Sequence, residues 1–214
     1  MEEYRYLQEL TERYPALKGL EEEIRAAFLV IKESFEAGGK LLVAGNGGSC
    51  ADAEHIVGEL MKGFYRQRPL PDAEKEAIGE IGTFLQGALP AIALTGHPAL
   101  STAFLNDVKA DMTFAQQVYG YGKAGDVLIA LSTSGNSANV LHAVTVAKAR
   151  NLAVIGLTGR DGGRLREICD VCITVPAWVT ADIQEYHLPV YHTLCAMLEE
   201  YFFPECEAER TGTD

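Results

Sequence analysis

Short apolar runs alternate along this chain with segments of helical periodicity, and this alternation constrains the fold more than any other feature. Five runs are nearly continuous in apolar residues, at 40–44, 91–95, 126–131, 153–157 and 171–175. Near-continuous apolar strands separated by helices are typical of a parallel sheet that is covered on both faces. We therefore predict an α/β fold with ligands bound at the carboxyl ends of the strands, where the strand-to-helix loops lie.

Helices are expected before these strands and between them. The N-terminal segment 1–38 is predicted to be a helical extension, with helices over about 2–13 and 20–37. Their apolar faces must pack on the rest of the domain or on another subunit. Further helices are expected to end near residues 62 and 150 and to cover about 99–107, 113–121 and 182–200. At 214 residues, the chain fits a single domain, 1–214.

Two segments fall outside this regular pattern. The connection 66–90 is long and carries prolines and glycines around a possible short helix. A connection of this length is usually a functional lid, an interface element or a mobile segment. The polar tail 205–214 is expected to fray.

The charge balance bears on what the chain can bind. With 18 Lys and Arg against 30 Asp and Glu, the formal charge is −12, which argues against a general nucleic-acid partner because phosphate neutralisation needs a basic face. A single anionic ligand is still allowed, since a few backbone N–H groups can hold one phosphate. No apolar run approaches the ~18 residues of a membrane span, and the N-terminus lacks a signal-peptide pattern. We expect a cytoplasmic protein without a membrane partner.

Cys169 and Cys172 form a Cys-x-x-Cys pair, which is the spacing of a redox motif or of half a zinc site. The pair lies within an apolar run, 168–175, that we interpret as a buried strand. We therefore expect both thiols to be small core residues rather than a redox or metal site.

Two loops are rich in residues that can surround a phosphate. Gly-Asn-Gly-Gly-Ser at 45–49 follows a predicted strand and opens a helix, where glycines allow close approach and the first N–H groups are free. It matches neither the dinucleotide nor the Walker fingerprint, so no nucleotide cofactor is expected, and it could also be only a tight turn. Ser-Thr-Ser-Gly-Asn-Ser at 132–137 is the stronger signal, because one helix cap needs one hydroxyl rather than four.

Titratable side chains cluster on two of the predicted helices. His55 and Glu59 are four residues apart and share one helix face, a spacing found both in zinc sites and in surface pairs. Gln184 and His192 belong to the last helix, where eight residues rise ~12 Å. Both could serve one site only if Gln184 lies at or before the helix start, or if the two residues come from different subunits.

Together these motifs resemble the phosphoheptose isomerase family of the sugar isomerase (SIS) domain group. The resemblance runs from about the second helix to residue 198 and keeps the order and local spacing of the motifs. They are Gly-Asn-Gly-Gly-Ser at 45–49, His55 with Glu59, Asn-Asp at 106–107, Ser-Thr-Ser-Gly-Asn-Ser at 132–137, Leu-Thr-Gly-Arg-Asp-Gly-Gly at 157–163, and Ile-Gln-Glu-Tyr-His at 183–187 followed by His192. Asn-Asp by itself would be ordinary helix-ending chemistry.

The resemblance implies a three-layer αβα sandwich of flavodoxin-like topology, a homotetramer and active sites shared between subunits. It implies the interconversion of sedoheptulose 7-phosphate and D-glycero-D-manno-heptose 7-phosphate, with one zinc ion per site. The residues that match its phosphate ligands are Ser132, Thr133, Ser134 and Ser137. The residues implied to contact the sugar are Asn46, Gly47, Gly48, Ser49, Glu59, Asn106, Asp107 and Gln184. The implied zinc ligands are His55, Glu59, Gln184 and His192, of which Glu59 and His192 also match the catalytic base and acid.

These residue types suit the reaction. Aldose–ketose isomerisation moves a proton between adjacent carbons through an enediol, so it needs a base near one carbon and an acid near the oxygen. A metal or another charged group must stabilise the developing enediolate. Glu59 could take the C–H proton while His192 serves the oxygen. Zinc could polarise the carbonyl or only fix the site.

Two other functions stay open. Tetrameric relatives bind a replication initiator and some SIS modules only sense sugar phosphates, so a non-catalytic binding protein is one alternative. The presence of both Glu59 and His192 favours the enzyme. Isomerisation of a different sugar phosphate is the second alternative, because the connection 66–90 is longer than the family's usual link. No basic residue matches the family's site arginine cleanly, although Lys62, Arg66 and Arg68 are near.

Overall fold

A computed structural model describes residues 4–204 and contains a five-stranded sheet in which all strand pairs are parallel. The strands are β1 (Leu41–Ala44), β2 (Ala91–Ala93), β3 (Val127–Leu131), β4 (Ala153–Thr158) and β5 (Val171–Thr174). Each overlaps one of the predicted apolar runs. The spatial order β2-β1-β3-β4-β5 is that of a flavodoxin-like sheet, which confirms the predicted α/β fold.

Alternate residues of the strands face two separate hydrophobic cores, because side chains along a strand point to opposite faces. In β3, Val127, Ile129 and Leu131 belong to one core, whereas Leu128 and Ala130 belong to the other. All five are almost completely buried. Both faces of the sheet are therefore covered, as the near-continuous apolar runs predict.

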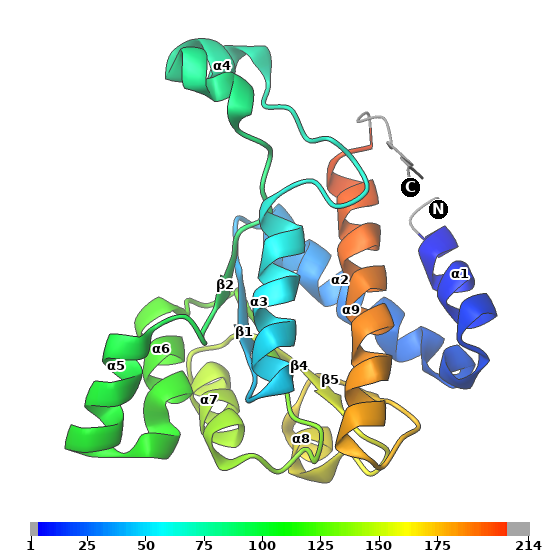
Figure 1. Ribbon diagram of the computed structural model, residues 1–214, viewed down its shortest axis with the longest axis vertical. Helices are drawn as coiled ribbons and strands as arrows, with labels where there is room; N and C mark the ends of the chain where they lie inside the picture. The colour runs from blue at the N-terminus through cyan, green and yellow to red at the C-terminus, as the bar shows by residue number, and fades with distance from the viewer. Residues whose placement is uncertain (1–3, 205–214) are drawn as a thin grey trace.

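Helices cover each face, which makes three layers (Figure 1). The first core includes residues of α1 (Arg5–Arg13), α2 (Glu21–Glu36), α3 (Gly48–Met61) and α9 (Thr180–Phe202), with the 3-10 helix η2 (Pro15–Leu20) between α1 and α2. The second core includes residues of α6 (Thr113–Tyr121), α7 (Ala138–Ala149) and α8 (Gly163–Ile168). The N-terminal helices thus bury their apolar faces within the same chain, with α1 packed beside α9.

The structure refines one of the sequence-based expectations and shows that another is wrong. The helix expected over 99–107 divides into α5 (Pro98–Ala103) and a π-helical turn, η4 (Phe104–Val108), followed by the 3-10 helix η5 (Ala110–Met112). The run 168–175 is not one buried strand, because α8 continues to Ile168 and Cys169 ends it. Cys169 and Cys172 are half-buried and lie over Gly156 of β4, where a Cβ would come within 2.9–3.2 Å of their sulfur atoms.

Residues 69–86 form an arm that projects away from the sheet (Figure 1). The arm carries α4 (Asp72–Ile78) and the 3-10 helix η3 (Glu80–Phe84), and α4 has no buried residue. A bridge between Pro69 and Gln86 closes its base. The arm leaves the C-terminal end of α3, whereas the glycine loop enters the N-terminal end. The expected fraying of 205–214 concerns residues outside the described range. Within residues 4–204, no helix is long and apolar enough to cross a membrane.

His187 of α9 is completely buried in the first layer of helices. Neither ring nitrogen has a hydrogen-bond partner of good geometry among the described residues. Burial lowers the pKa of His187 to about 4, and the backbone of Thr158 offsets only part of this effect. The folded protein therefore keeps this ring neutral at pH values where an unfolded chain would protonate it.

His187 should make stability depend on pH. Between about pH 6.5 and pH 4 the unfolded chain binds a proton that the folded chain excludes, so stability falls as pH falls through this window. We expect His187→Leu to remove this dependence. The unfolding free energy of wild type, relative to that of the variant, should fall by about 2–3 kcal/mol from pH 7.5 to pH 4.5. Urea unfolding at both pH values measures it, with the partly exposed His97→Leu as control. Parallel pH curves for wild type and His187→Leu would contradict the prediction.

Candidate functional site

The two candidate phosphate loops meet where the strand order changes direction. One follows β1 and the other follows β3, and these strands are neighbours in the sheet. In sheets of this kind, the crevice outside the carboxyl ends of such a pair is where ligands bind. The amides of Asn46 and Asn139 exchange two hydrogen bonds, of 2.9 and 2.8 Å, and so join the two loops. Asn139 was not predicted, because it lies inside the helical segment that follows the second loop.

The loop 132–137 is shaped by its own hydroxyl groups. The hydroxyl oxygens of Ser132 and Ser137 are 2.9 Å apart, and Ser134 Oγ accepts a hydrogen bond of 3.1 Å from the N–H of Asn136. Ser137 precedes α7 but makes no side-chain cap bond, so simple capping does not account for it. The loop therefore presents hydroxyls beside the first N–H groups of a 12-residue helix, which is a favourable environment for an anion.

A cavity of about 190 Å³ lies beside this loop. Thr133, Ser134 and Asn136 line one side of it, and Arg160 and Trp178 contribute to the rest. Gly159 N–H donates to the carbonyl of Thr133 over 2.9 Å, which ties the loop after β4 to the loop after β3. Arg160 and Asp161, both within the 157–163 motif, bring one positive and one negative side chain to the cavity.

The glycine loop receives a side chain from α9. Gly47 has φ +58°, a conformation that favours glycine, and it precedes the first residue of α3. A Cβ at Gly48 would lie 2.5–2.7 Å from the amide of Gln184, so any other residue there would displace that amide. Ser49 is buried beneath the loop. Gln184 thus lies at the phosphate end of α3.

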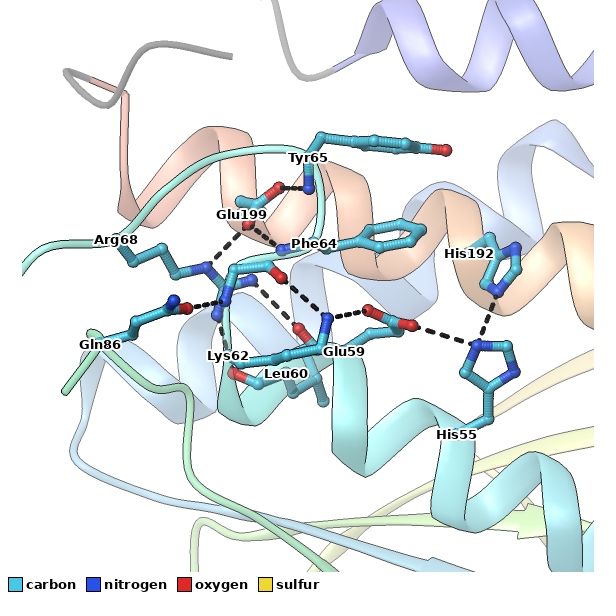
Figure 2. Close-up of polar contacts among 11 residues, drawn as sticks. His55, Glu59, Leu60, Lys62, Phe64, Tyr65, Arg68, Gln86, His192 and Glu199 are labelled. Atoms are coloured by element: carbon cyan, nitrogen blue, oxygen red, sulfur yellow. Dashed lines mark hydrogen bonds and ion pairs between the residues drawn. The ribbon is translucent and has the colours of Figure 1, made fainter. Parts of the chain in front are cut away.

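His55, Glu59 and His192 meet further along α3 (Figure 2). His55 Nε2 is 3.1 Å from Glu59 Oε1 and 3.4 Å from His192 Nε2. The second oxygen of Glu59 is 3.2 Å from Lys62 Nζ, and the Glu59 side chain is 13% exposed. Burial, and then the nearby His55, lower the pKa of His192, which favours a neutral ring near pH 7.

Tyr191 and Asp52 orient the ring of His55. The Tyr191 hydroxyl donates to Asp52 Oδ1 over 3.2 Å and is 3.0 Å from His55 Nδ1. Because its one proton goes to Asp52, the hydroxyl oxygen accepts from Nδ1–H of His55. His55 Nε2, on the other side of the ring, faces Glu59 and His192. Neither Asp52 nor Tyr191 was predicted, since 139 residues separate them.

The remaining expected site residues are not joined to this cluster. Gln184 is inside α9, which begins at Thr180, so it does not precede the helix and lies two turns before His192. Asn106 and Asp107 are exposed on η4, where the Asn106 amide donates to the Asp107 carboxylate over 2.6 Å. A second cavity, of about 300 Å³, adjoins His192 between α1 and α9. Within one chain, therefore, the site is divided between two ends of α3.

Comparisons with known proteins decide the family. The SIS domain family matches residues 5–75 and 72–159, so the two matched segments meet inside the arm. A phosphoheptose isomerase of Thiobacillus denitrificans is 45% identical over 84% of this chain and 84% of its own length. Another, of Rhodospirillum rubrum, is 43% identical over 80% of this chain and 81% of its own length. The chain belongs to the phosphoheptose isomerase family.

The fold agrees with this family membership. The solved structure of a phosphoheptose isomerase from Neisseria gonorrhoeae superimposes with a TM-score of 0.73 at 37% identity, covering 93% of this chain and 94% of that one. The resemblance inferred from the motifs is thus confirmed, as is the three-layer α/β architecture. The roles of individual site residues rest on the geometry described above.

Removing the Ser134 hydroxyl should weaken anion binding. The loop geometry offers this group to an oxyanion, and a hydrogen bond to a charged group contributes about 1.5–3 kcal/mol. We expect Ser134→Ala to reduce the affinity for inorganic phosphate about 10-fold or more, measured by titration calorimetry. Thr145→Ala is the matched control, because the Thr145 hydroxyl on α7 bonds the carbonyl of Leu141 instead. Equal affinities for Ser134→Ala and wild type would remove Ser134 from the anion site.

Proposed function

We propose that this chain interconverts sedoheptulose 7-phosphate and D-glycero-D-manno-heptose 7-phosphate through an enediol. The observation that carries the proposal is the cluster of Glu59 and His192 around His55, on the same helix that the glycine loop enters. Relatives from several bacteria bear the name phosphoheptose isomerase at 39–45% identity. The proposal joins this family membership to a pair of groups able to move a proton.

Each residue has a distinct role in the proposed reaction. Glu59, as a carboxylate, removes the proton from the carbon next to the carbonyl, and returns it to the neighbouring carbon. His192, neutral near pH 7, exchanges a proton with the substrate oxygens. Lys62, beside Glu59, adds a positive charge near the developing enediolate.

The two ends of α3 suit a substrate whose phosphate and carbonyl groups are far apart. The phosphate would lie against the loop 132–137, near the start of α3, while the carbonyl carbons would lie near Glu59, eleven residues further along. That separation is ~16 Å of helix rise, and the Glu59 side chain shortens it because helical side chains lean toward the N-terminus. A long sugar phosphate therefore fits this arrangement better than a short one.

A non-catalytic sugar-phosphate-binding protein needs the phosphate loop alone. The chain has both Glu59 and His192 in mutual contact with His55, which favours an enzyme over a sensor or an adaptor for a replication initiator. A different sugar phosphate would use the same two groups, so the assay that follows includes shorter aldose and ketose phosphates as competing substrates.

Glu59→Gln should abolish turnover while leaving binding intact. The amide keeps the shape of the carboxylate but cannot accept the C–H proton, so we expect kcat to fall by ~10²-fold or more. The measurement is conversion of sedoheptulose 7-phosphate by wild type and variant, with binding of the same sugar followed by calorimetry. Glu54→Gln, on the same helix and hydrogen bonded to Thr95, is the control. Normal turnover by Glu59→Gln would remove the base role from this residue.

We also propose a zinc ion at His55, Glu59 and His192. Two imidazoles and a carboxylate are common zinc ligands, and the separations of 3.1 and 3.4 Å approach the ~3.3 Å between ligands in tetrahedral zinc. His55 Nε2 faces a carboxylate and another ring nitrogen, an arrangement that a cation in place of the proton would stabilise. Among the described residues, no three such side chains are already arranged to hold a metal ion. The proposed ligands would therefore have to move closer together when zinc binds.

Zinc would stabilise negative charge on the substrate oxygen or fix the ligands.

Gln184 belongs to the proposed ligand set only if it reaches the ion from another copy of the chain, because it lies two turns from His192 on α9. We infer a homotetramer with shared sites on this ground, and because Trp178, which lines the cavity beside the phosphate loop, exposes 66% of its surface. The four free thiols among the described cysteines suit the cytoplasm, the compartment that we propose.

Zinc binding can be measured apart from activity. We expect wild type to bind zinc and His55→Ala to bind it at least 10-fold more weakly, because one of three ligands is lost. Calorimetry with zinc chloride, and metal content after dialysis, give the affinity and the stoichiometry. His142→Ala, on α7 outside the cluster, controls for adventitious histidine binding. Zinc affinity that is the same for His55→Ala and wild type would contradict this site.

A further inference from the structure

A completely buried ion pair joins the end of α3 to α9 (Figure 2). Arg68 Nε donates to Glu199 Oε1 over 2.8 Å, and the two side chains are 0% and 1% exposed. Two charges taken out of water are costly, and well-packed apolar residues often serve stability equally well. The pair therefore calls for a reason beyond stability.

Arg68 also binds the backbone of Glu59, the proposed base. Its other two nitrogens donate to the carbonyls of Leu60, over 2.8 Å, and Glu59, over 3.2 Å. These carbonyls belong to the last turn of α3, which ends at Met61, and carbonyls at a helix end lack partners within the helix. A positive charge also stabilises the negative end of the helix dipole. Arg68 thus fixes the backbone of Glu59 and, with it, the origin of the Glu59 side chain.

Glu199 holds the surroundings of His192. It lies seven residues after His192 on α9, about two turns, and so shares its face of the helix. Its oxygens accept hydrogen bonds from the N–H groups of Phe64, over 2.8 Å, and Tyr65, over 2.7 Å. The ring of Phe64 packs on His192, with centroids 5.3 Å apart. Glu199 thus reaches the imidazole through Phe64.

We propose that Arg68 and Glu199 are positioning residues that set the separation of Glu59 and His192. One planar guanidinium bonds both the Glu59 carbonyl and the Glu199 carboxylate, so movement of α3 along α9 cannot preserve both contacts. This inference rests on the proposed function and deepens it, because it names the device that keeps the proton-transferring groups at a fixed spacing.

Arg66 and Glu200, two positions before Arg68 and one after Glu199, supply a matched control pair. Arg66 Nη2 lies 2.7 Å from both oxygens of Glu200, and the two side chains are 10% and 4% exposed. Arg5 of α1 also contacts Glu200, at 3.0 Å. Arg66–Glu200 is thus another shielded arginine–carboxylate pair on α9, and Arg66 Nη1 donates to the carbonyl of Pro204 over 3.0 Å.

The test compares Arg68→Lys with Arg66→Lys. Lysine can keep the charge pairing but cannot bridge Glu199 and both carbonyls with a planar fork. We expect Arg68→Lys to lower kcat for sedoheptulose 7-phosphate about 10-fold or more, with KM within about twofold, since a misplacement of ~1 Å can cost 10²-fold. Arg66→Lys should leave kcat within twofold. All assays are run well below each variant's unfolding temperature.

A second readout does not require turnover. The side-chain imidazole signals of His55 and His192 in nuclear magnetic resonance spectra should shift in Arg68→Lys and stay unchanged in Arg66→Lys. If wild type does not turn over the sugar, the proposed function fails, while these signals still test the positioning. Unmoved signals and unchanged kcat in Arg68→Lys, or equal effects of both lysine variants, would overturn the inference.

Glu199→Gln covers the case in which Arg68→Lys does not fold. The amide keeps the shape of the side chain, but its NH₂ group faces a backbone N–H or the guanidinium instead of accepting from it. We expect the same fall in kcat and the same shifts of the histidine signals. If neither Arg68→Lys nor Glu199→Gln folds while Arg66→Lys does, the pair is required for folding and the positioning proposal is rejected.

Discussion

The change of strand order between β1 and β3 is the constraint on which the site depends. At this point the helices that follow the two strands lie on opposite faces of the sheet, which opens a crevice at their carboxyl ends. The Asn46–Asn139 amide pair joins the two loops that border the crevice. Everything beyond it, including the approach of α9 to the glycine loop through Gln184, follows from the direction in which α3 leaves β1.

The packing of α3 on α9 turns that crevice into a longer site. His55 and Glu59 on one helix face His192 on the other, and the contact is fixed at its far end by Arg68 and Glu199. Removing one member of such a buried pair leaves an uncompensated charge, which typically costs 3–5 kcal/mol. Geometry and stability are therefore linked at this end of α3, where the arm also begins.

The sequence predicts local features well and long-range contacts poorly. The strands were found because each buries a continuous apolar run, and the His55–Glu59 pair because four residues is one helix turn. The Tyr191–Asp52 and Arg68–Glu199 contacts span 139 and 131 residues, and no periodicity indicates which distant side chains will meet. Cys169 was misplaced for a related reason, since an apolar run does not show where a short helix ends and a strand begins.

Net charge is a poor guide to this site. The chain carries a formal charge of −12, yet the loop after β3 offers hydroxyls and helix N–H groups to an anion, and Arg160 from the loop after β4 lines the same cavity. Interactions between exposed charges are screened within about 8–10 Å at physiological ionic strength, whereas donors in contact with a ligand are not. The local donors therefore decide whether a phosphate binds, and the acidic surface elsewhere mainly slows the approach of anions, to a degree that salt reduces.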